Sequence, residues 1–96
     1  MKKAEITIKK GIDVQVGAKL IDCAMQFKCH LFIEKESKRM RAKSLMSVLS
    51  LSLVPGDKIS IIADGVDEDR AIDLLTKAFN TSFMNQDVID EIKGDK

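Results

Sequence analysis

The stretch that most constrains the fold lies near the C-terminus, where apolar residues recur with a helical period. They occupy positions i, i+3, i+4, i+7 and i+8 of one segment: Ala71, Leu74, Leu75, Ala78 and Phe79. Such a stripe covers one face of an α-helix, and that face has to be buried against another layer. A chain of 96 residues can build only one core, so this helix shares it with every other element.

Four short segments rich in strand-forming residues supply the opposing layer. They cover residues 4–8, 30–34, 39–42 and 58–63. Alternation along the first segment places Ile6 and Ile8 on its inner face, whereas Phe32 and Ile62 are expected on the opposite, open face of the sheet. The second and third segments are joined by a polar turn, which indicates a hairpin.

Two further helices are expected between these strands. Asp13 precedes a helical pattern over residues 14–27, and Ser44 precedes a shorter one over residues 45–51. Both side chains are of the type that caps a helix by accepting a bond from a free backbone N–H, and Asp67 stands similarly before the third helix. The order β-α-β-β-α-β-α predicts an α+β fold with an antiparallel sheet covered by helices on one face.

Residues 83–96 lie beyond this pattern and form a C-terminal extension of a domain that covers residues 1–82. Four apolar residues of the extension keep a helical period: Met84, Val88, Ile89 and Ile92. A short additional helix and an irregular tail both remain open for this segment.

The charge balance argues against direct binding of nucleic acid. Sixteen Lys and Arg face fifteen Asp and Glu, which leaves a net charge of +1, whereas such binders rely on excess positive charge. The basic run over residues 35–43 contains no aromatic residue, so we expect a solvated hairpin edge there. No segment has the apolar length of a signal-peptide core or a membrane span, so we expect a cytoplasmic protein without membrane insertion.

The side chains that most often carry chemistry are few. His30 is the single histidine, and no metal site or nucleophile pair can be built around it, so an exposed or partly covered strand residue is expected. Cys23 is expected to pack as a small core residue. Cys23 and Cys29 have neither disulfide density nor metal spacing, and both are expected as reduced thiols.

Ser44 allows two interpretations from the residues alone. As an N-cap its hydroxyl stabilises the helix by about 1 kcal/mol, and a hydroxyl at a helix start is also a place where phosphate is tolerated. Leu45, Met46 and Leu49 would then present an apolar surface of the kind that partners use. Without further information, the capping role is favoured.

Several segments together resemble HPr, the small phosphocarrier of the bacterial sugar phosphotransferase system. Residues 43–51 read Lys-Ser-Leu-Met-Ser-Val-Leu-Ser-Leu, which is similar to the Lys-Ser-[Ile/Leu]-Met-Gly-x-[Met/Leu]-Ser-Leu signature of that family. Gly11-Ile12 before the first helix and the Gly-Val-Asp-Glu stretch at 65–68 also match. The resemblance spans residues 4–82. It implies the HPr-like open-faced β-sandwich, a four-stranded antiparallel sheet with three helices on one face.

The chain departs from the family where HPr carries Gly-[Ile/Leu]-His-Ala-Arg-Pro-Ala. In HPr the His accepts phosphate from enzyme I and the Arg steadies it. Here Asp13 occupies the phospho-His position and Gln15 the Arg position. Without the Arg, no cation offsets the charge of an incoming phosphate. We therefore do not expect a competent His phosphocarrier.

The family's serine motif is retained. Ser44 matches the serine that HPr kinase/phosphorylase phosphorylates in Gram-positive relatives, whose product binds a transcriptional regulator of carbon catabolite repression. The resemblance implies Ser44 as the phospho-acceptor of a regulatory protein. It implies a partner-binding surface made by Lys43, Leu45, Met46, Ser47 and Leu49. Ser47 stands where the family usually has Gly.

Two alternatives to this regulatory function remain open. A carboxylate can in principle form an acyl phosphate, so Asp13 would then relay phosphate itself. An inactive binding or assembly module would instead use the open sheet face around Phe32 and Ile62. None of the three functions is enzymatic or requires a metal or cofactor, and all fit a monomer or a weak homodimer.

Overall fold

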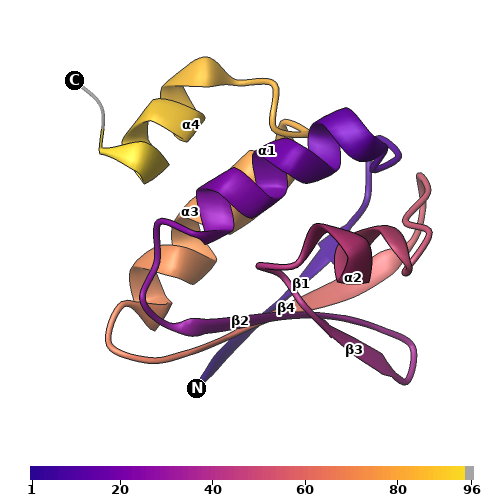
Figure 1. Cartoon of the computed structure of the whole chain (residues 1–96), viewed down its shortest axis with the longest axis horizontal. Helices are drawn as coiled ribbons and strands as arrows, with labels where there is room; N and C mark the ends of the chain where they lie inside the picture. The colour runs from indigo at the N-terminus through magenta and orange to yellow at the C-terminus, as the bar shows by residue number, and fades with distance from the viewer. Residues whose placement is uncertain (95–96) are drawn as a thin grey trace.

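Four antiparallel strands form one sheet in the computed structural model, which describes residues 1–94 (Figure 1). The strands are β1 (Lys2–Thr7), β2 (His30–Lys35), β3 (Lys38–Arg41) and β4 (Lys58–Asp64). Their spatial order is β1-β4-β2-β3, so β4 lies between β1 and β2, and β3 forms the far edge. This is the sheet of the open-faced sandwich that the resemblance implies.

The helices cover one face of this sheet, as Figure 1 shows. They are α1 (Val14–Ala24), α2 (Leu45–Leu49), α3 (Glu68–Asn80) and α4 (Gln86–Lys93). Helix α3 packs on β1 and β4, while α2 packs between β3 and α1. The expected stripe on α3 is buried throughout, and Ile6 and Ile8 face the same core. No helix within residues 1–94 is long and apolar enough to cross a membrane.

The first helix differs from the expectation at both ends. It ends at Ala24, and Phe27 is buried in the loop that follows rather than on the helix. Val14, expected on the buried stripe, is 61% exposed. Val14 is the first residue of the helix, where the chain has just entered from the surface, so its side chain extends past the edge of the core.

Asp67 does not cap its own helix, contrary to the expectation. Its side chain makes no capping bond to α3. Instead, its two carboxylate oxygens accept hydrogen bonds from the backbone N–H groups of Lys28 (2.8 Å) and Cys29 (2.9 Å). Asp67 therefore ties the start of α3 to the loop between α1 and β2, a long-range contact that a local capping pattern cannot reveal.

The open face of the sheet exposes less apolar surface than expected. Phe32 and Ile62 are register partners on β2 and β4, and Ile62 lies outside the core cluster between sheet and helices. Ile62 is nevertheless only 2% exposed, flanked in the ladder by Lys3 on one side and Phe32 on the other. Phe32 is half-buried beneath the guanidinium of Arg39, 5.8 Å from the ring centre.

The C-terminal extension forms the helix α4, which packs on α3 and α1. Asn85 caps it by accepting a bond from Asp87 N at 2.9 Å, and Ile89 and Ile92 are buried beneath it. Met84, which shares their helical period, lies before the helix and is 64% exposed. The last two residues of the extension, 95 and 96, lie outside the described residues.

The first residue of the extension, Phe83, forms a buried aromatic pair with Phe79 of α3. Phe83 is fully buried and packs edge-to-face on Phe79, with ring centres 5.0 Å apart. The Phe83 N–H donates to Ala78 O at 2.7 Å, which closes the end of α3. Phe83 has a φ of 58°, a left-handed conformation that bulky residues rarely adopt. Burial of its ring compensates for this backbone strain.

Candidate functional site

Asp13 acts as the N-cap of α1, as its position predicts. Its backbone is extended, and its Oδ1 accepts a hydrogen bond from Val16 N at 2.9 Å. Asp13 and Gln15 are both exposed. Within residues 1–94, no Lys or Arg forms an ion pair with Asp13. This carboxylate thus stabilises the helix start and forms no ion pair with the described residues.

Ser44 caps α2 in the same way, but more weakly. Its Oγ accepts a bond from Ser47 N at 3.4 Å, which is long for an N–H···O bond. The backbone of Ser44 is extended (φ −121°, ψ 114°), and the residue is half-buried. The hydroxyl is therefore held only by a long hydrogen bond, in a residue that is partly accessible to solvent.

Gly17 determines how closely α2 lies on α1. A Cβ added to Gly17 would stand 3.0 Å from Leu45 Cδ1 and 3.6 Å from Leu49 Cδ2. The missing side chain lets both leucines settle against α1, where each is half-buried. The expected docking residues Leu45 and Leu49 thus bury part of their apolar surface between α1 and α2, and this part is not available to a partner.

Met46 and Val14 supply the exposed apolar surface of the two packed helices. Met46 is 79% exposed on α2, as expected for a docking residue. Val14 is the exposed first residue of α1, a position that helical periodicity had assigned to the core. We refer to Val14, Leu45, Met46 and Leu49 as the α1–α2 patch. Large apolar side chains exposed on two packed helices mark a candidate contact surface.

Lys43 is engaged within the chain. Its Nζ donates to Phe27 O at 2.7 Å and to Cys29 O at 2.9 Å. These bonds fix the loop between α1 and β2 beneath the segment that enters α2. The sequence motif gives no sign of this role, because the acceptors are backbone carbonyls distant in sequence.

The two serines after Ser44 support its surroundings. Ser47 donates its N–H to the Ser44 hydroxyl and is half-buried. Ser50, at the end of α2, is exposed and donates its hydroxyl to Ser47 O at 2.6 Å. Ser50 therefore offers a second exposed hydroxyl on α2, useful as a control for any modification of Ser44.

The remaining candidate residues lie apart from this site. Burial raises the pKa of the Cys23 and Cys29 thiols to about 11 in each case, so both stay protonated at neutral pH. His30 is exposed at the start of β2. Within residues 1–94, no group of His, Cys, Asp and Glu is arranged to hold a metal ion.

Known proteins match both the sequence and this geometry. Residues 1–81 match the family described as "PTS HPr component phosphorylation site". The HPr-like protein Crh of Halalkalibacterium halodurans is 35% identical over 74 residues, which cover 77% of this chain and 88% of that one.

Solved structures agree with this relationship. HPr-C-His from Thermoanaerobacter tengcongensis superposes with a TM-score of 0.82 at 30% identity, covering 88% of this chain and 98% of that one. Crh from Bacillus subtilis, described as a catabolite repression protein with a swapped dimer, superposes with a TM-score of 0.70 at 30% identity. That match covers 85% of this chain and 94% of the Crh chain.

Proposed function

This chain belongs to the HPr family, and on that premise we propose that it is a regulatory HPr-like protein whose signal is phosphate on Ser44. A kinase of the HPr kinase/phosphorylase type would transfer the γ-phosphoryl group of ATP to Ser44 Oγ. ADP leaves, and the hydroxyl proton passes to a base of the kinase. The phosphorylated protein would then bind a transcriptional regulator of carbon catabolite repression, in the cytoplasm.

The observation that carries the proposal is the contrast between the two helix starts. At α1, a carboxylate replaces the histidine of the family, accepts a bond from Val16 N and has Gln15 in place of the family's Arg. At α2, the serine of the family is retained, its hydroxyl makes one long hydrogen bond, and the residue is partly exposed. Phosphate relay through Asp13 would require an acyl phosphate on a carboxylate that has no ion-pair partner in the described structure, which disfavours that route.

The α1–α2 patch is the surface on which a partner would dock. A phosphoserine adds about −1.5 to −2 charges and three strong acceptor oxygens at neutral pH. Placed at the edge of exposed Met46, this charge would pair with Arg side chains of a regulator, while Met46 and Val14 fill apolar positions on it. The fold itself would change little, because phosphate oxygens still accept the Ser47 N–H.

Phosphorylation by the kinase tests this proposal directly. The protein is incubated with an HPr kinase/phosphorylase and ATP, and the modified residue is located by mass spectrometry. We expect one phosphate on Ser44 and none on the Ser44→Ala variant. Ser50→Ala, which removes another hydroxyl of the same helix, should be phosphorylated like the wild type. Phosphate on Ser50, or none at all, would overturn the assignment.

The B. subtilis relative also suggests an oligomeric state. Its structure is described as a swapped dimer, and β1 of this chain is an edge strand. The amino terminus pairs with Glu68 at 3.2 Å and Lys2 pairs with Asp69 at 2.8 Å, exposed contacts that each contribute little. We infer a monomer in equilibrium with a weak homodimer. Light scattering over a concentration series would detect it.

A further inference from the structure

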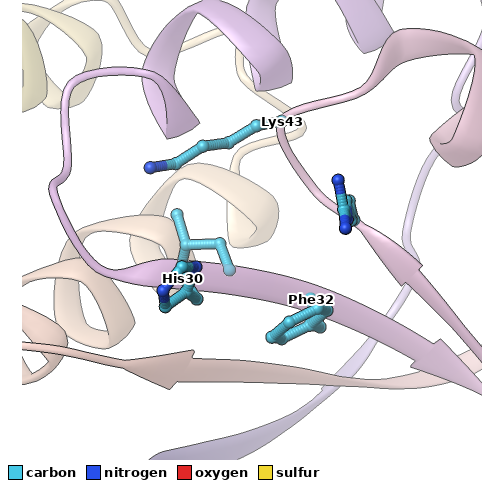
Figure 2. Close-up of a pocket in the computed structure, with 5 residues that line it drawn as sticks. His30, Phe32 and Lys43 are labelled. Carbon is cyan, nitrogen blue, oxygen red and sulfur yellow. The ribbon is translucent and has the colours of Figure 1, made fainter.

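The lining of a cavity at the edge of the sheet includes neither Ser44 nor a residue of the α1–α2 patch, although it includes Lys43, which precedes Ser44 in the sequence. The cavity has a volume of about 300 Å³ and is lined by His30, Leu31, Phe32, Arg41 and Lys43. Figure 2 shows His30 and Phe32 on strand β2, with Lys43 reaching in from the segment that follows β3. The cavity opens where that segment leaves the sheet, and its volume lies at the small end of the range for ligand sites.

The lining of this cavity is basic. Arg41 is exposed, and it takes part in none of the ion pairs found among residues 1–94. The Lys43 ammonium is fixed at the rim by Phe27 O and Cys29 O. No acidic residue lines the cavity, although the whole chain carries a net charge of only +1. Positive charge is thus concentrated in the lining, and Asp64, the ladder partner of His30, pairs with the amino terminus instead.

A backbone donor faces the same edge. Ala42 N donates to Leu31 O at 2.9 Å, the last bond between the hairpin strands. The N–H and C=O groups of one strand residue point to the same edge, so the Leu31 N–H also faces this side. In the described structure no bond returns from it to Ala42, because the chain turns away toward α2. A backbone N–H without its usual ladder bond, in a cavity that Arg41 also lines, is suited to an anion.

Phe32 gives the cavity a flat apolar wall. Its ring is half-buried above the sheet, beside its ladder partner Arg41. Arg39 lies over the ring at 5.8 Å and is held there by Glu34 at 3.3 Å. The ring is thereby kept in one position rather than free to rotate out of the cavity.

From this arrangement we propose that the cavity binds a small anion attached to a flat apolar body, either a phosphate ester or a carboxylate. The Arg41 guanidinium forms a two-pronged bond to the anion, and the Leu31 N–H donates to it as well. The flat body lies against the Phe32 ring. A free molecule that carries the anion and a flat apolar body gains both contacts, whereas the acidic side chain of a partner protein has no flat body to lie against Phe32.

An NMR titration of the full chain tests this site. Phenyl phosphate and benzoate are the probes, and benzyl alcohol is the uncharged control of similar shape. We expect saturable shifts at the Leu31 amide and the His30 ring with either anion and none with benzyl alcohol. The tighter of the two anions identifies the ligand as a phosphate ester or a carboxylate. Arg41→Gln should weaken binding by at least about tenfold, because loss of even one of the two charge-assisted hydrogen bonds has that effect.

Matched variants distinguish specific binding in this cavity from nonspecific attraction of anions to a basic surface. Lys38→Gln removes the same charge from the other end of β3 and should leave the affinity unchanged. Arg41→Lys keeps the charge but loses the two-pronged geometry, and should bind more weakly than the wild type. The proposal is wrong if Lys38→Gln weakens binding as much as Arg41→Gln, or if benzyl alcohol produces the same shifts. It is also wrong if a Glu-rich peptide moves the same signals at lower concentration than either small anion.

Discussion

Gly17 on α1 lies closely against Leu45 on α2: a Cβ added to Gly17 would stand only 3.0 Å from Leu45 Cδ1. The spacing of the two helices that carry the proposed regulatory surface therefore depends on one missing side chain. Leu45 is half-buried, and the atom closest to the added Cβ is the end of its side chain, so a small displacement is feasible.

A small side chain at position 17 should therefore affect the stability of the protein much less than a branched one. Gly17→Ala should change the free energy of unfolding by less than about 1 kcal/mol, because the gain in helix propensity offsets the displacement of Leu45. Gly17→Val should lower it by about 1–3 kcal/mol through overpacking against Leu45 and Leu49. Urea denaturation measures both variants, and equal stability for the two would contradict the close packing of α1 and α2.

Asp67 should make stability depend on acid pH. Desolvation, the largest single influence, raises its pKa, but the hydrogen bonds from Lys28 N, Cys29 and its own backbone together hold the pKa below the ordinary value of 3.8. A folded pKa below the unfolded one means that the unfolded state takes up the proton first. This contribution is present above the unfolded pKa and is lost as pH falls through the lower folded pKa.

The variant Asp67→Ala tests that linkage. It should lower the stability at neutral pH by about 1–3 kcal/mol, because the N–H groups of Lys28 and Cys29 lose their acceptor. Its stability should also fall less than that of the wild type when the pH is lowered from neutral to about 3. Asp73→Ala, which removes an exposed carboxylate from the same helix, serves as the control. Parallel pH profiles for wild type and Asp67→Ala would show that Asp67 has no such role.

The C-terminal helix should be an integral part of the fold. Ile92 is buried beneath α4, so Ile92→Ala should lower the free energy of unfolding by about 2–5 kcal/mol. Met84→Ala, an exposed position of the same extension, should change it by less than about 0.5 kcal/mol. Thermal and urea unfolding of the full chain compare the two. No difference between them would mean that α4 does not stay docked in solution.

The cysteines should resist modification in the native protein. Burial raises the pKa of the Cys23 and Cys29 thiols to about 11, and a thiolate is the reactive form. Labelling with a disulfide reagent at neutral pH should be slow for the folded chain and fast in denaturant. Rapid labelling of the native protein at either position would contradict this burial.

Much of the fold was predictable because period and capping are local signals. Neighbouring residues alone predict three features: the stripe of α3, the inward orientation of Ile6 and Ile8, and the caps at Asp13 and Ser44. Asp67 was misassigned because its partners lie almost forty positions away in sequence. For the same reason, nothing in the motif over residues 43–51 revealed that Lys43 bonds two carbonyls of another loop.

The candidate site was predictable only in part. The retained serine and the replaced histidine are visible in the sequence, and family membership supports their comparison. The exposure of Val14 could not be predicted from the sequence. A residue in the first turn of a helix keeps the period of the buried stripe even where its side chain projects beyond the core. The basic cavity could not be predicted either, because its lining residues come from two separate stretches of the chain, 30–32 and 41–43, which only the fold brings together.

The central claim is that phosphate enters this protein through Ser44 and not through the start of α1. The most direct measurement supplies the two phosphate donors side by side: ATP with HPr kinase/phosphorylase, and phosphoenolpyruvate with enzyme I, with an authentic HPr as the positive control for both. We predict label on Ser44 in the first reaction and unlabelled protein in the second, where HPr is labelled. Label from phosphoenolpyruvate that is lost in Asp13→Asn, together with no label from ATP, would contradict the account.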